Sequence, residues 1–421
     1  MMKHRWIAAL AVLSIMPAMA FAESNGTGFD TVPCELEAGA PMPGSGEVLN
    51  ANPSNAQAVL DSASAGALVI LENGTYAGNL VVKSPYTRVR GESRNGVILD
   101  GNSTREIGIS AVGVDGVVFE NLTAHNFTRH GFFWHHAHGY WGRYLTAYNN
   151  GLYGVYAFDS RCGQIDHSYG SGNADSAFYI GECYPCDATI TDILAESNAL
   201  GYSGTNAGGN LILKDSIWRN NAMGIVPNTL DGEDRPPQRG ITIKENLIVN
   251  NNAITAPGTS LAGTFYGVGI ALAGGVGNQV YGNVVTDHAL AGIITAPLPD
   301  QNLWIPSGNT IWGNTVTHDA EAFPDSYDLG QNLASGPNNC WTDNTFGNSQ
   351  PPMIEEIYSC GMSTTPPGGS PLIELGLVQG FAGLNGRVQS DWKTWPVPAD
   401  ALTQADAPAG SLAEWLPEVS I

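Results

Sequence analysis

Polar residues end four repeated runs of the sequence, and their types suit acid–base or metal chemistry. The runs are Gly131–His136, Gly154–Asp159, Ala177–Glu182 and Gly201–Asn206. If consecutive runs form neighbouring strands, Asp159 and Glu182 lie roughly 5 Å apart, a separation at which one carboxylate raises the pKa of the other and a general acid is distinguished from a general base. His136 would then transfer a proton, and the two carboxylates would also suit a divalent cation such as Ca²⁺. The alternative is that these side chains only solvate turns at strand ends.

Histidines are concentrated in one short stretch. Five of the nine lie between residues 125 and 138. His136 and His138 are two residues apart and share a face if this stretch is a strand, which is ligand geometry for Zn or Cu. The alternative is that these imidazoles are acid–base groups or pack as aromatic rings beside Phe132, Phe133 and Trp134.

Strand alternation also predicts which side chains of the runs face outward. The inward positions are Phe132, Val155, Phe178, Tyr202 and Ile225, and the outward ones are Phe133, Tyr156, Tyr179 and Ser203. An outward column of aromatic rings could bind sugars, with Asn206 and Asn228 as further substrate-binding residues. The alternative is that a loop covers the column. Arg129, Arg143 and Arg161 lie in or beside the same runs and predict a locally positive patch, which keeps uronic-acid polymers open as substrates.

The repeat itself predicts the fold. Asn126, Asn149, Asn173, Asn198 and Asn221 are 23, 24, 25 and 23 residues apart, and the spacing widens after Asn221. Such a period, with two or three short β runs and no helical pattern, favours an all-β solenoid, the parallel β-helix, with one coil per repeat. Asn at a sharp turn bonds to the same position one coil away, so we expect these residues to be structural. The wider spacing predicts loops inserted at residues 228–239 and 257–264.

Three early segments resemble the first coils of the pectin-lyase-like superfamily of right-handed parallel β-helix proteins. They are Val69–Tyr76, Val89–Gly91 and Val97–Gly101, and the resemblance covers roughly residues 48 to 350. Members of this superfamily include pectate and alginate lyases, mannuronan C5-epimerases, polygalacturonases and periplasmic copper-maturation proteins. The Asp-Pro-His-Asp run of the epimerases and the paired-Asp and Gly-His set of the polygalacturonases are not found in this sequence, and a fold alone does not define an activity.

The resemblance therefore implies two kinds of function. The first is a carbohydrate-active enzyme that acts on a polysaccharide by lyase, epimerase or hydrolase chemistry along the exposed face. The second is a non-catalytic periplasmic or surface protein that binds a glycan or handles copper. Both would be monomers.

The termini and the charge set further limits. Residues 1–22 read as a signal peptide with a charged start, an apolar run too short to span a membrane and an Ala-Phe-Ala cleavage site, so a secreted or periplasmic protein is expected. The next segments are an N-terminal extension (23–47) and the β-helix (48–360), whose first coil is capped by a helix near residues 55–60. The Pro-rich tail (361–421) is expected to pack loosely or to be partly disordered. The net charge of −22, from 17 basic and 39 acidic residues, excludes an electrostatic nucleic-acid binder.

Six cysteines fit an oxidising compartment. Cys340 and Cys360 are the preferred disulfide pair. Cys183 and Cys186 either close on each other or send one sulfur to Cys162. A CxxC motif is also found in redox and metal sites, but the absence of a second such motif favours structural disulfides.

Overall fold

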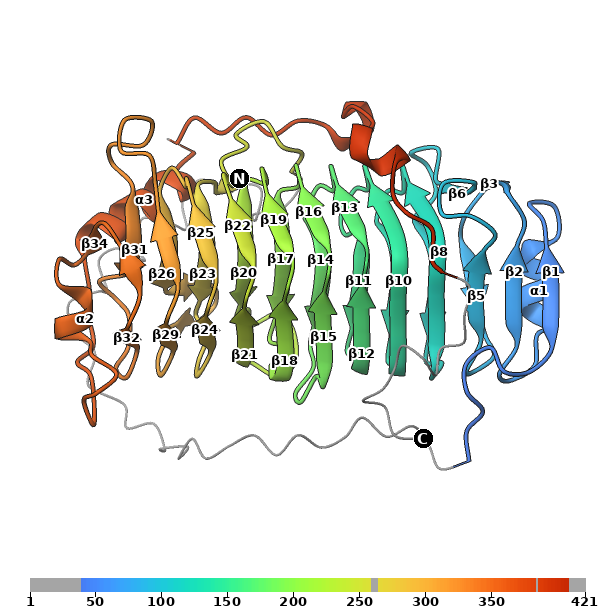
Figure 1. The fold of residues 1–421 in the computed structure, drawn as a ribbon, viewed down its shortest axis with the longest axis horizontal. Coiled ribbons are helices and arrows are strands. Elements are labelled where there is room, and N and C mark those ends of the chain that lie inside the picture. Colours follow the sequence, from blue (N-terminus) through green and yellow to red (C-terminus); the bar gives the residue numbers. More distant parts are fainter. Residues whose placement is uncertain (1–38, 259–263, 384, 409–421) are drawn as a thin grey trace. The chain divides into compact units, whose positions relative to one another are not determined.

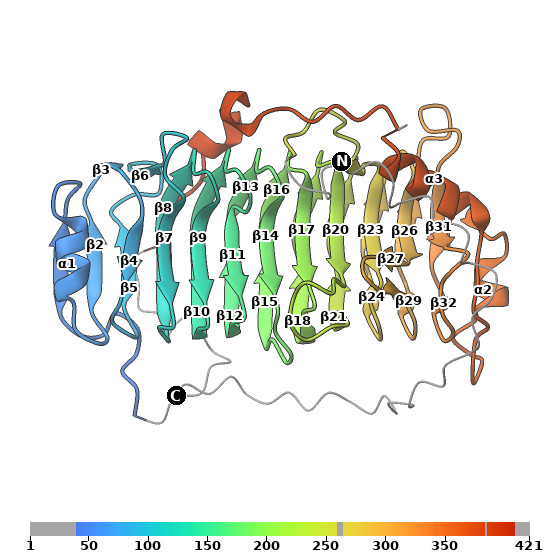
Figure 2. The ribbon, with the colours of Figure 1, turned by 180° about the vertical axis from the view of Figure 1, so that it is seen from behind.

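Short parallel strands, stacked coil on coil, form nearly all of the regular structure. The computed structural model describes residues 39–258, 264–383 and 385–408, and within them the strands form a 21-stranded sheet, an 11-stranded sheet and one short antiparallel pair. Figure 1 shows the coils side by side, and Figure 2, seen from behind, shows the strands of the smaller sheet. All pairings within the two large sheets are parallel, which confirms the predicted all-β solenoid.

Each complete coil contributes one strand to the smaller sheet and two consecutive segments to the larger one. The smaller sheet contains β4 (Leu80–Val82), β7 (Ile107–Val112), β9 (His130–His135), β11 (Val155–Phe158), β14 (Ser176–Gly181), β17 (Leu200–Thr205), β20 (Met223–Asn228), β23 (Val268–Ala273), β26 (Ala291–Ala296), β31 (Tyr327–Gln331) and β34 (Ser349–Gln350).

The larger sheet has two columns of strands, and β8 (Val117–His125) and β10 (His138–Tyr148) run through both. The first column also has β1 (Val48–Ala51), β2 (Leu68–Leu71), β5 (Arg88–Gly91), β12 (Arg161–Asp166), β15 (Ala188–Thr191), β18 (Gly208–Lys214), β21 (Arg239–Lys244), β24 (Gln279–Tyr281), β29 (Thr310–Trp312) and β32 (Cys340–Thr342). The second column has β3 (Gly74–Tyr76), β6 (Val97–Asp100), β13 (Tyr169–Ser171), β16 (Leu194–Glu196), β19 (Ile217–Arg219), β22 (Leu247–Val249), β25 (Val284–Thr286), β30 (Thr315–Thr317) and β33 (Thr345–Phe346).

The core lies inside the coils and follows the predicted alternation. Phe132, Val155 and Phe178 are register partners in adjacent coils and are fully buried. Tyr202 and Ile225 continue the same inward column. Each coil buries one apolar side chain at this position, and these side chains stabilise neighbouring strands by packing on one another. The period-2 pattern of the sequence therefore predicts which residues face the interior of the stack.

Asparagines form a hydrogen-bonded ladder at the turn between the larger and the smaller sheet. Its members are Asn150, Asn173, Asn198, Asn221 and Asn251, and each of the first four donates from its side-chain amide to the next one's Oδ1 at 2.9–3.0 Å. The expectation that Asn residues here are structural agrees with these bonds. The expected membership is wrong for Asn126 and Asn149, which precede the ladder position and have positive φ angles of 60° and 52°.

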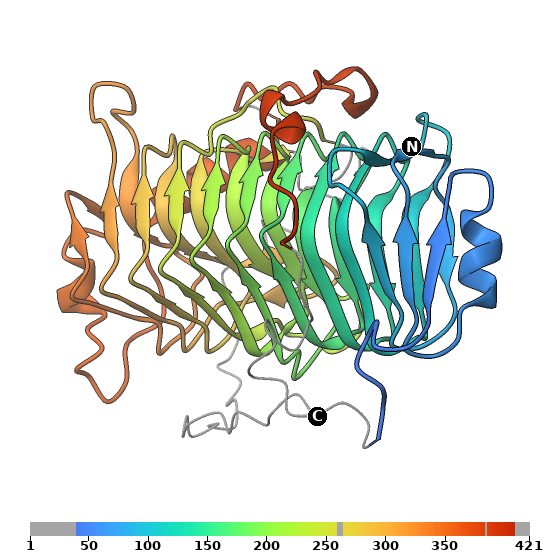
Figure 3. The same cartoon turned by 45° about the vertical axis from the view of Figure 1, so that its right-hand side comes forward.

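Helices cover the coil at each end of the stack. Helix α1 (Ala56–Ser62) buries Ala56 and Leu60 against the first coil, which confirms the predicted capping helix (Figure 3). Helix α2 (Ile354–Ile357) buries Ile354 at the other end. Such caps shield the last strands from pairing with other chains.

The described part of the tail is largely irregular, and its contacts contradict the expectation of loose packing there. After α3 (Pro371–Phe381) it runs back along one edge of the coils through the short 3₁₀ helices η2 (Trp392–Thr394) and η3 (Ala399–Leu402) (Figure 1). Trp392, Ala401 and Ala407 are buried, and Ala407 N–H donates to Asn121 Oδ1 at 2.8 Å. The tail is therefore a packed strap. The remaining elements are β27 (Leu298–Pro299) and β28 (Leu303–Trp304), which form the antiparallel hairpin.

Two of the predicted disulfide arrangements are present. Cys340 and Cys360 are bonded, as preferred from the sequence, and Cys183 closes on Cys186 rather than on Cys162. Cys162 is itself disulfide-bonded. The predicted signal peptide (1–22), residues 23–38 of the extension and residues 409–421 lie outside the described residues. Among the described residues, no helix has the length and apolar character needed to cross a membrane.

Candidate functional site

The predicted polar column lies at the turn that follows the smaller sheet. His136, Asp159, Glu182 and Asn206 come directly after β9, β11, β14 and β17, and all four have positive φ angles between 44° and 54°. Backbone bonds connect successive turns: Asp159 N–H donates to Gly181 O at 3.0 Å, and Glu182 N–H donates to Thr205 O at 2.9 Å. The register drawn from the sequence is therefore confirmed, and the four residues lie in adjacent coils.

Within this column, the His136 imidazole and the Asp159 carboxylate are in direct contact. His136 Nδ1 is 2.6 Å from Asp159 Oδ2, and the other carboxylate oxygen binds the guanidinium of Arg235. The His136 side chain is 58% exposed and that of Asp159 is 20% exposed. A carboxylate bonded to Nδ1 fixes the orientation and tautomer of an imidazole and stabilises its protonated form. The accessible acid–base unit is thus a histidine–carboxylate pair.

Glu182 is held by a loop instead of facing solvent. Its carboxylate accepts a bond from Asp234 N–H at 2.7 Å, and its backbone carbonyl accepts one from Arg235. Burial raises its pKa, the bond from Asp234 opposes this, and the nearby charges of Asp234 and Asp159 raise the pKa further. Asp159 and Glu182 do interact electrostatically, as expected. They are not equally accessible, because Glu182 is 8% exposed and bonded to the loop, whereas the Asp159 side chain is 20% exposed.

The two asparagines predicted to bind substrate are occupied by protein partners. Asn206 donates to Leu230 O at 2.8 Å and to Glu233 O at 3.1 Å, and it accepts from Leu230 N–H. Asn228 accepts from Thr205 Oγ1 and donates to Ser203 Oγ. Both side chains are buried, so in this structure they secure the inserted loop and the strand ends.

The aromatic column faces outward but is only partly open. Phe133, Tyr156 and Tyr179 are register partners; Phe133 and Tyr156 stack at a centroid distance of 4.9 Å, and Tyr156 meets Tyr179 edge-on at the same distance. Tyr153 packs against both tyrosines. Tyr179 is only 1% exposed because its hydroxyl lies under the loop and donates to Glu233 at 3.1 Å. The alternative that a loop covers the aromatic column is therefore confirmed for Tyr179, whereas Phe133 is half-buried.

Glu233 is the main ionisable residue that sequence reasoning missed. Burial raises its pKa to about 7; the bond from Tyr179 opposes the shift, and the charges of Glu182 and Asp175 add to it. A carboxyl group with this pKa holds a proton for part of the time at neutral pH, which suits a general acid. The only sequence signal for Glu233 and Arg235 was the widened repeat spacing, which predicted the loop but not where its side chains reach.

The histidines adopt a different grouping from the one predicted. Ligand atoms of His135, His136 and Asp159 lie within 4.8 Å of one another. His136 occupies a left-handed turn, so strand alternation does not place it beside His138, whose Nδ1 instead accepts from Arg161 Nε at 3.1 Å. Two imidazoles and one carboxylate are a donor set that fits Zn or Cu better than Ca²⁺, which prefers oxygen ligands.

A cavity of about 280 Å³ opens beside these groups. Its lining includes His136, Asp159, Arg161, Arg235 and the half-exposed Tyr184. Arg161 and Arg235 are exposed, and two aspartates of the same lining, Asp115 and Asp159, balance their charges. The predicted positive patch is corrected at Arg143, which is buried and bound to Asp166 at 2.9 Å.

Comparisons with known proteins support the fold. Residues 138–302 match the family model described as right handed beta helix region. No curated protein matches the chain. The A-module of the Azotobacter vinelandii mannuronan C-5 epimerase AlgE4 is similar with a TM-score of 0.50 at 14% identity, over 74% of this chain and 94% of that one.

Two further solved structures are similar at lower scores. The alginate lyase from Paenibacillus sp. str. FPU-7 has a TM-score of 0.44 at 12% identity, over 72% of this chain and 99% of that one. The enzymatically active domain of the bacteriophage CBA120 tailspike protein 2 has a TM-score of 0.47 at 9% identity, over 72% and 46%. The chain therefore has the fold of a right-handed parallel β-helix.

Proposed function

We propose that this protein is an exported enzyme that acts on a polysaccharide at the turn column and the adjoining aromatic face. The observation that carries the proposal is the exposed His136 imidazole, oriented by Asp159 beside a cavity that Arg161 and Arg235 help to line, and next to the Phe133–Tyr156 stack. The mannuronan C-5 epimerase module, which has the same fold, supports a polysaccharide as the substrate class.

Proton abstraction fits this arrangement better than hydrolysis. Hydrolysis by the usual route needs two accessible carboxyl groups facing the same glycosidic bond. Here Asp159 is bonded to both His136 and Arg235, and Glu182 is covered by the loop. In a lyase or epimerase, His136 would accept the proton of a sugar carbon, Asp159 would stabilise the resulting imidazolium, and Arg161 or Arg235 would offset negative charge on the substrate.

The predicted sugar-binding role is assigned to fewer of the aromatic residues, because the loop covers part of the column. Phe133 would contact a sugar ring, because it is only half-buried, whereas Tyr156 is 9% exposed and would support the Phe133 ring by stacking on it. Tyr179 would act indirectly, because its hydroxyl positions Glu233. Glu233 would return a proton if movement of the loop gave it access to substrate.

A polysaccharide panel tests the proposal. Wild-type protein is incubated with uronate and neutral polysaccharides, with and without Ca²⁺, and assayed for unsaturated products by ultraviolet absorbance, for reducing ends, and by NMR for epimerisation without cleavage. His136→Ala and Asp159→Asn should lower the rate by roughly 10²-fold or more, the range for loss of a general base. His167→Ala is the matched control, because His167 is also an exposed histidine bonded to an aspartate, at 2.8 Å from Asp166.

Two results would contradict it. One is that the wild-type protein modifies none of the polysaccharides in the panel. The other is activity that survives in His136→Ala at the level of the His167→Ala control.

A second candidate is a non-catalytic role in which the histidine cluster binds Cu or Zn. The supporting observation is the convergence of His135, His136 and Asp159. Elemental analysis of protein purified without a histidine tag should then find stoichiometric metal, lost in a His135→Ala/His136→Ala variant and kept in His167→Ala. Metal-free protein of full stability would remove this candidate.

Export is part of the proposal and has a direct test. Expression of the full chain in a Gram-negative host, followed by fractionation and N-terminal sequencing, should recover mature protein that begins at Glu23. Intact protein retained in the cytoplasm would contradict the predicted signal peptide.

A further inference from the structure

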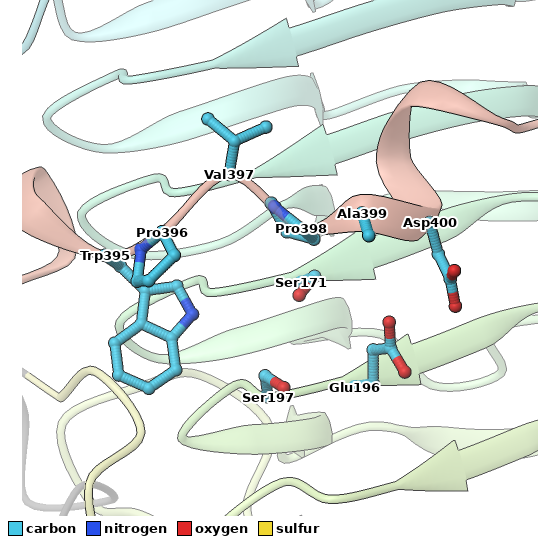
Figure 4. Close-up of a pocket in the computed structure, with 9 residues that line it drawn as sticks. All are labelled: Ser171, Glu196, Ser197, Trp395, Pro396, Val397, Pro398, Ala399 and Asp400. Atoms are coloured by element: carbon cyan, nitrogen blue, oxygen red, sulfur yellow. The ribbon is translucent and has the colours of Figure 1, made fainter.

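The tail strap and the edge of the coils border a second, open cavity of about 330 Å³ (Figure 4). Ser171, Glu196 and Ser197 line it from the ends of β13 and β16, and residues 395–400 line it from the tail. This edge leads into the smaller sheet, whereas the His136–Asp159 turn lies where the strands of that sheet end. The two cavities are therefore at opposite ends of the same strands.

Its carboxylates are held in place by neighbours. Buried Tyr169 donates from its hydroxyl to Glu196 Oε1 at 2.7 Å, and Arg219 Nε donates to Glu196 Oε2 at 2.8 Å. Arg219 also binds Asp400 Oδ2 at 3.1 Å, which connects the coil to the tail. Fixed acceptors lose little conformational entropy when a ligand binds, so this polar wall is pre-organised.

The indole of Trp395 forms the apolar wall (Figure 4). The backbone carbonyl of Trp395 accepts a hydrogen bond from Asn149 Nδ2 at 2.8 Å. The edge of its ring packs on Gly172, where a Cβ would lie 2.6 Å from Trp395 Cδ1. Gly172 also has a φ of 65°, so glycine suits this turn on both counts. The preceding Trp392 is buried, which secures the segment that carries Trp395.

The chemistry of the lining selects an uncharged ligand rich in hydroxyl groups. Glu196 and Asp400 supply two carboxylates against the single guanidinium of Arg219, so an anionic ligand such as a uronate is disfavoured. Carboxylates and serine hydroxyls bond well to sugar hydroxyls, and an indole packs against the C–H face of a sugar ring. The volume is at the lower end for small-ligand pockets.

We propose that this cavity binds a neutral pyranose unit of a glycan. The inference does not depend on the chemistry proposed for the His136–Asp159 turn, because no lining residue is shared. A protein with both sites would bind a glycan at the edge of the coils, while the reaction takes place at the His136–Asp159 turn.

Isothermal titration and ligand-observed NMR on the mature chain test the proposal with four probes. Three are neutral hexaoses built from glucose, xylose or mannose, and the fourth is a mannuronate hexamer. At least one neutral hexaose should bind, and the mannuronate hexamer should bind at least tenfold more weakly. Trp395→Ala should weaken the neutral ligand at least tenfold.

Three further variants distinguish binding in this cavity from binding elsewhere on the coils. Trp312→Ala is the matched control, because Trp312 is 39% exposed and stacks on Tyr281 on the outer face of the larger sheet. It should leave neutral-hexaose affinity unchanged, as should His167→Ala, because exposed His167 lines neither cavity. If Trp395→Ala does not fold, Ala399→Trp fills the cavity from an exposed position and should abolish binding.

The proposal is overturned by any of three results. They are no binding of the neutral hexaoses, equal loss in Trp312→Ala and Trp395→Ala, or preference for the mannuronate hexamer. Failure of the polysaccharide assay would not affect it, because hexaose binding is measured directly and the two cavities share no lining residue.

Discussion

Single residues of the inserted loop define the electrostatics of the candidate site. Arg235 binds Asp159 and the backbone of Glu182, while Glu233 bonds to Tyr179 and lies near Glu182. The column residues come from a regular repeat and are placed by it. The loop residues add a cation and a proton-holding carboxyl group to that column, and so they decide which column residues are exposed.

Glu233 should make stability depend on pH. Its folded pKa of about 7 lies above the ordinary glutamate value of 4.5, so between these values the unfolded chain loses a proton that the folded chain keeps. The free energy of unfolding therefore falls as pH rises through this window. In Glu233→Gln this fall should be smaller by about 2 kcal/mol, after allowance for solvent screening. Urea titrations at pH 4.5, 6 and 8 measure it.

The control for this prediction is an exposed glutamate. Glu321→Gln should reproduce the wild-type pH profile, because Glu321 lies on the surface away from the loop. A Glu233→Gln profile that coincides with wild type would show that Glu233 ionises normally in the folded protein.

At the scale of the elements, the asparagine ladder joins equivalent turns of successive coils, whose asparagines are 23 to 30 positions apart in the sequence. Asn198 accepts from Asn173 N–H and Nδ2 and donates to Asn221 Oδ1 and Gly170 O, and it is fully buried. A second ladder of Asn246, Asn283, Asn314 and Asn344 repeats the arrangement between the two columns of the larger sheet. Both ladders satisfy turn backbone groups that would otherwise be buried without partners.

Asn198→Asp should therefore be strongly destabilising. The substitution keeps the acceptors but turns a carboxylate toward the oxygens of Asn221 and Gly170, and the loss of buried donors should cost on the order of 3 kcal/mol or more. Asn220→Asp is the matched control, because Asn220 is exposed, accepts a bond from Asn250, and has a left-handed φ that Asp tolerates. It should change stability by no more than about 0.5 kcal/mol. Equal losses in the two variants would contradict a structural ladder.

At the scale of the whole molecule, the C-terminal region closes the stack twice. The Cys340–Cys360 disulfide holds the chain around α2 at the end of the coils. The strap then returns along the edge, where Asp406 accepts from the backbone of Arg94 and Ala405 O accepts from its buried guanidinium. Burial lowers the pKa of Arg94 to about 9. The last part of the chain is thus packed on one of the earliest coils.

Removal of the Cys340–Cys360 bond should destabilise the protein by about 3 kcal/mol, the chain-entropy value for a loop of this length. A Cys340→Ala/Cys360→Ala variant, unfolded in urea beside the wild-type protein, measures the loss. The proposed enzymatic activity should be kept below the unfolding transition, because the candidate site lies in coils far from this end. An unchanged midpoint would show that α2 packs without the covalent bond.

Deletion of residues 385–421 should abolish one of the two proposed sites and leave the other intact. The truncated protein should melt at a lower temperature, because Asn121 Oδ1, Asn149 Nδ2 and Arg94 lose their tail partners. It should lose neutral-hexaose binding while keeping polysaccharide turnover at the other turn. Retained hexaose binding would place that ligand elsewhere.

What the sequence alone determined is what repeats locally. The parallel β-helix follows from the period of the runs, and the inward side of Phe132 and outward side of Phe133 follow from strand alternation, because a stack of equal coils puts equivalent positions in contact. The register of His136, Asp159 and Glu182 was available for the same reason. The ladder membership was off by one at Asn149, because adjacent asparagines in a turn differ in backbone angle and not in residue type.

What only the tertiary structure decided depends on contacts between distant residues. Arg235 meets Asp159 across 76 positions, and Trp395 meets Asn149 across 246. No period describes such contacts, since loop and tail geometry is set by packing rather than by a repeating pattern. The covering of Tyr179, the raised pKa of Glu233 and the cavity beneath the tail all come from segments that leave the repeat and return to it.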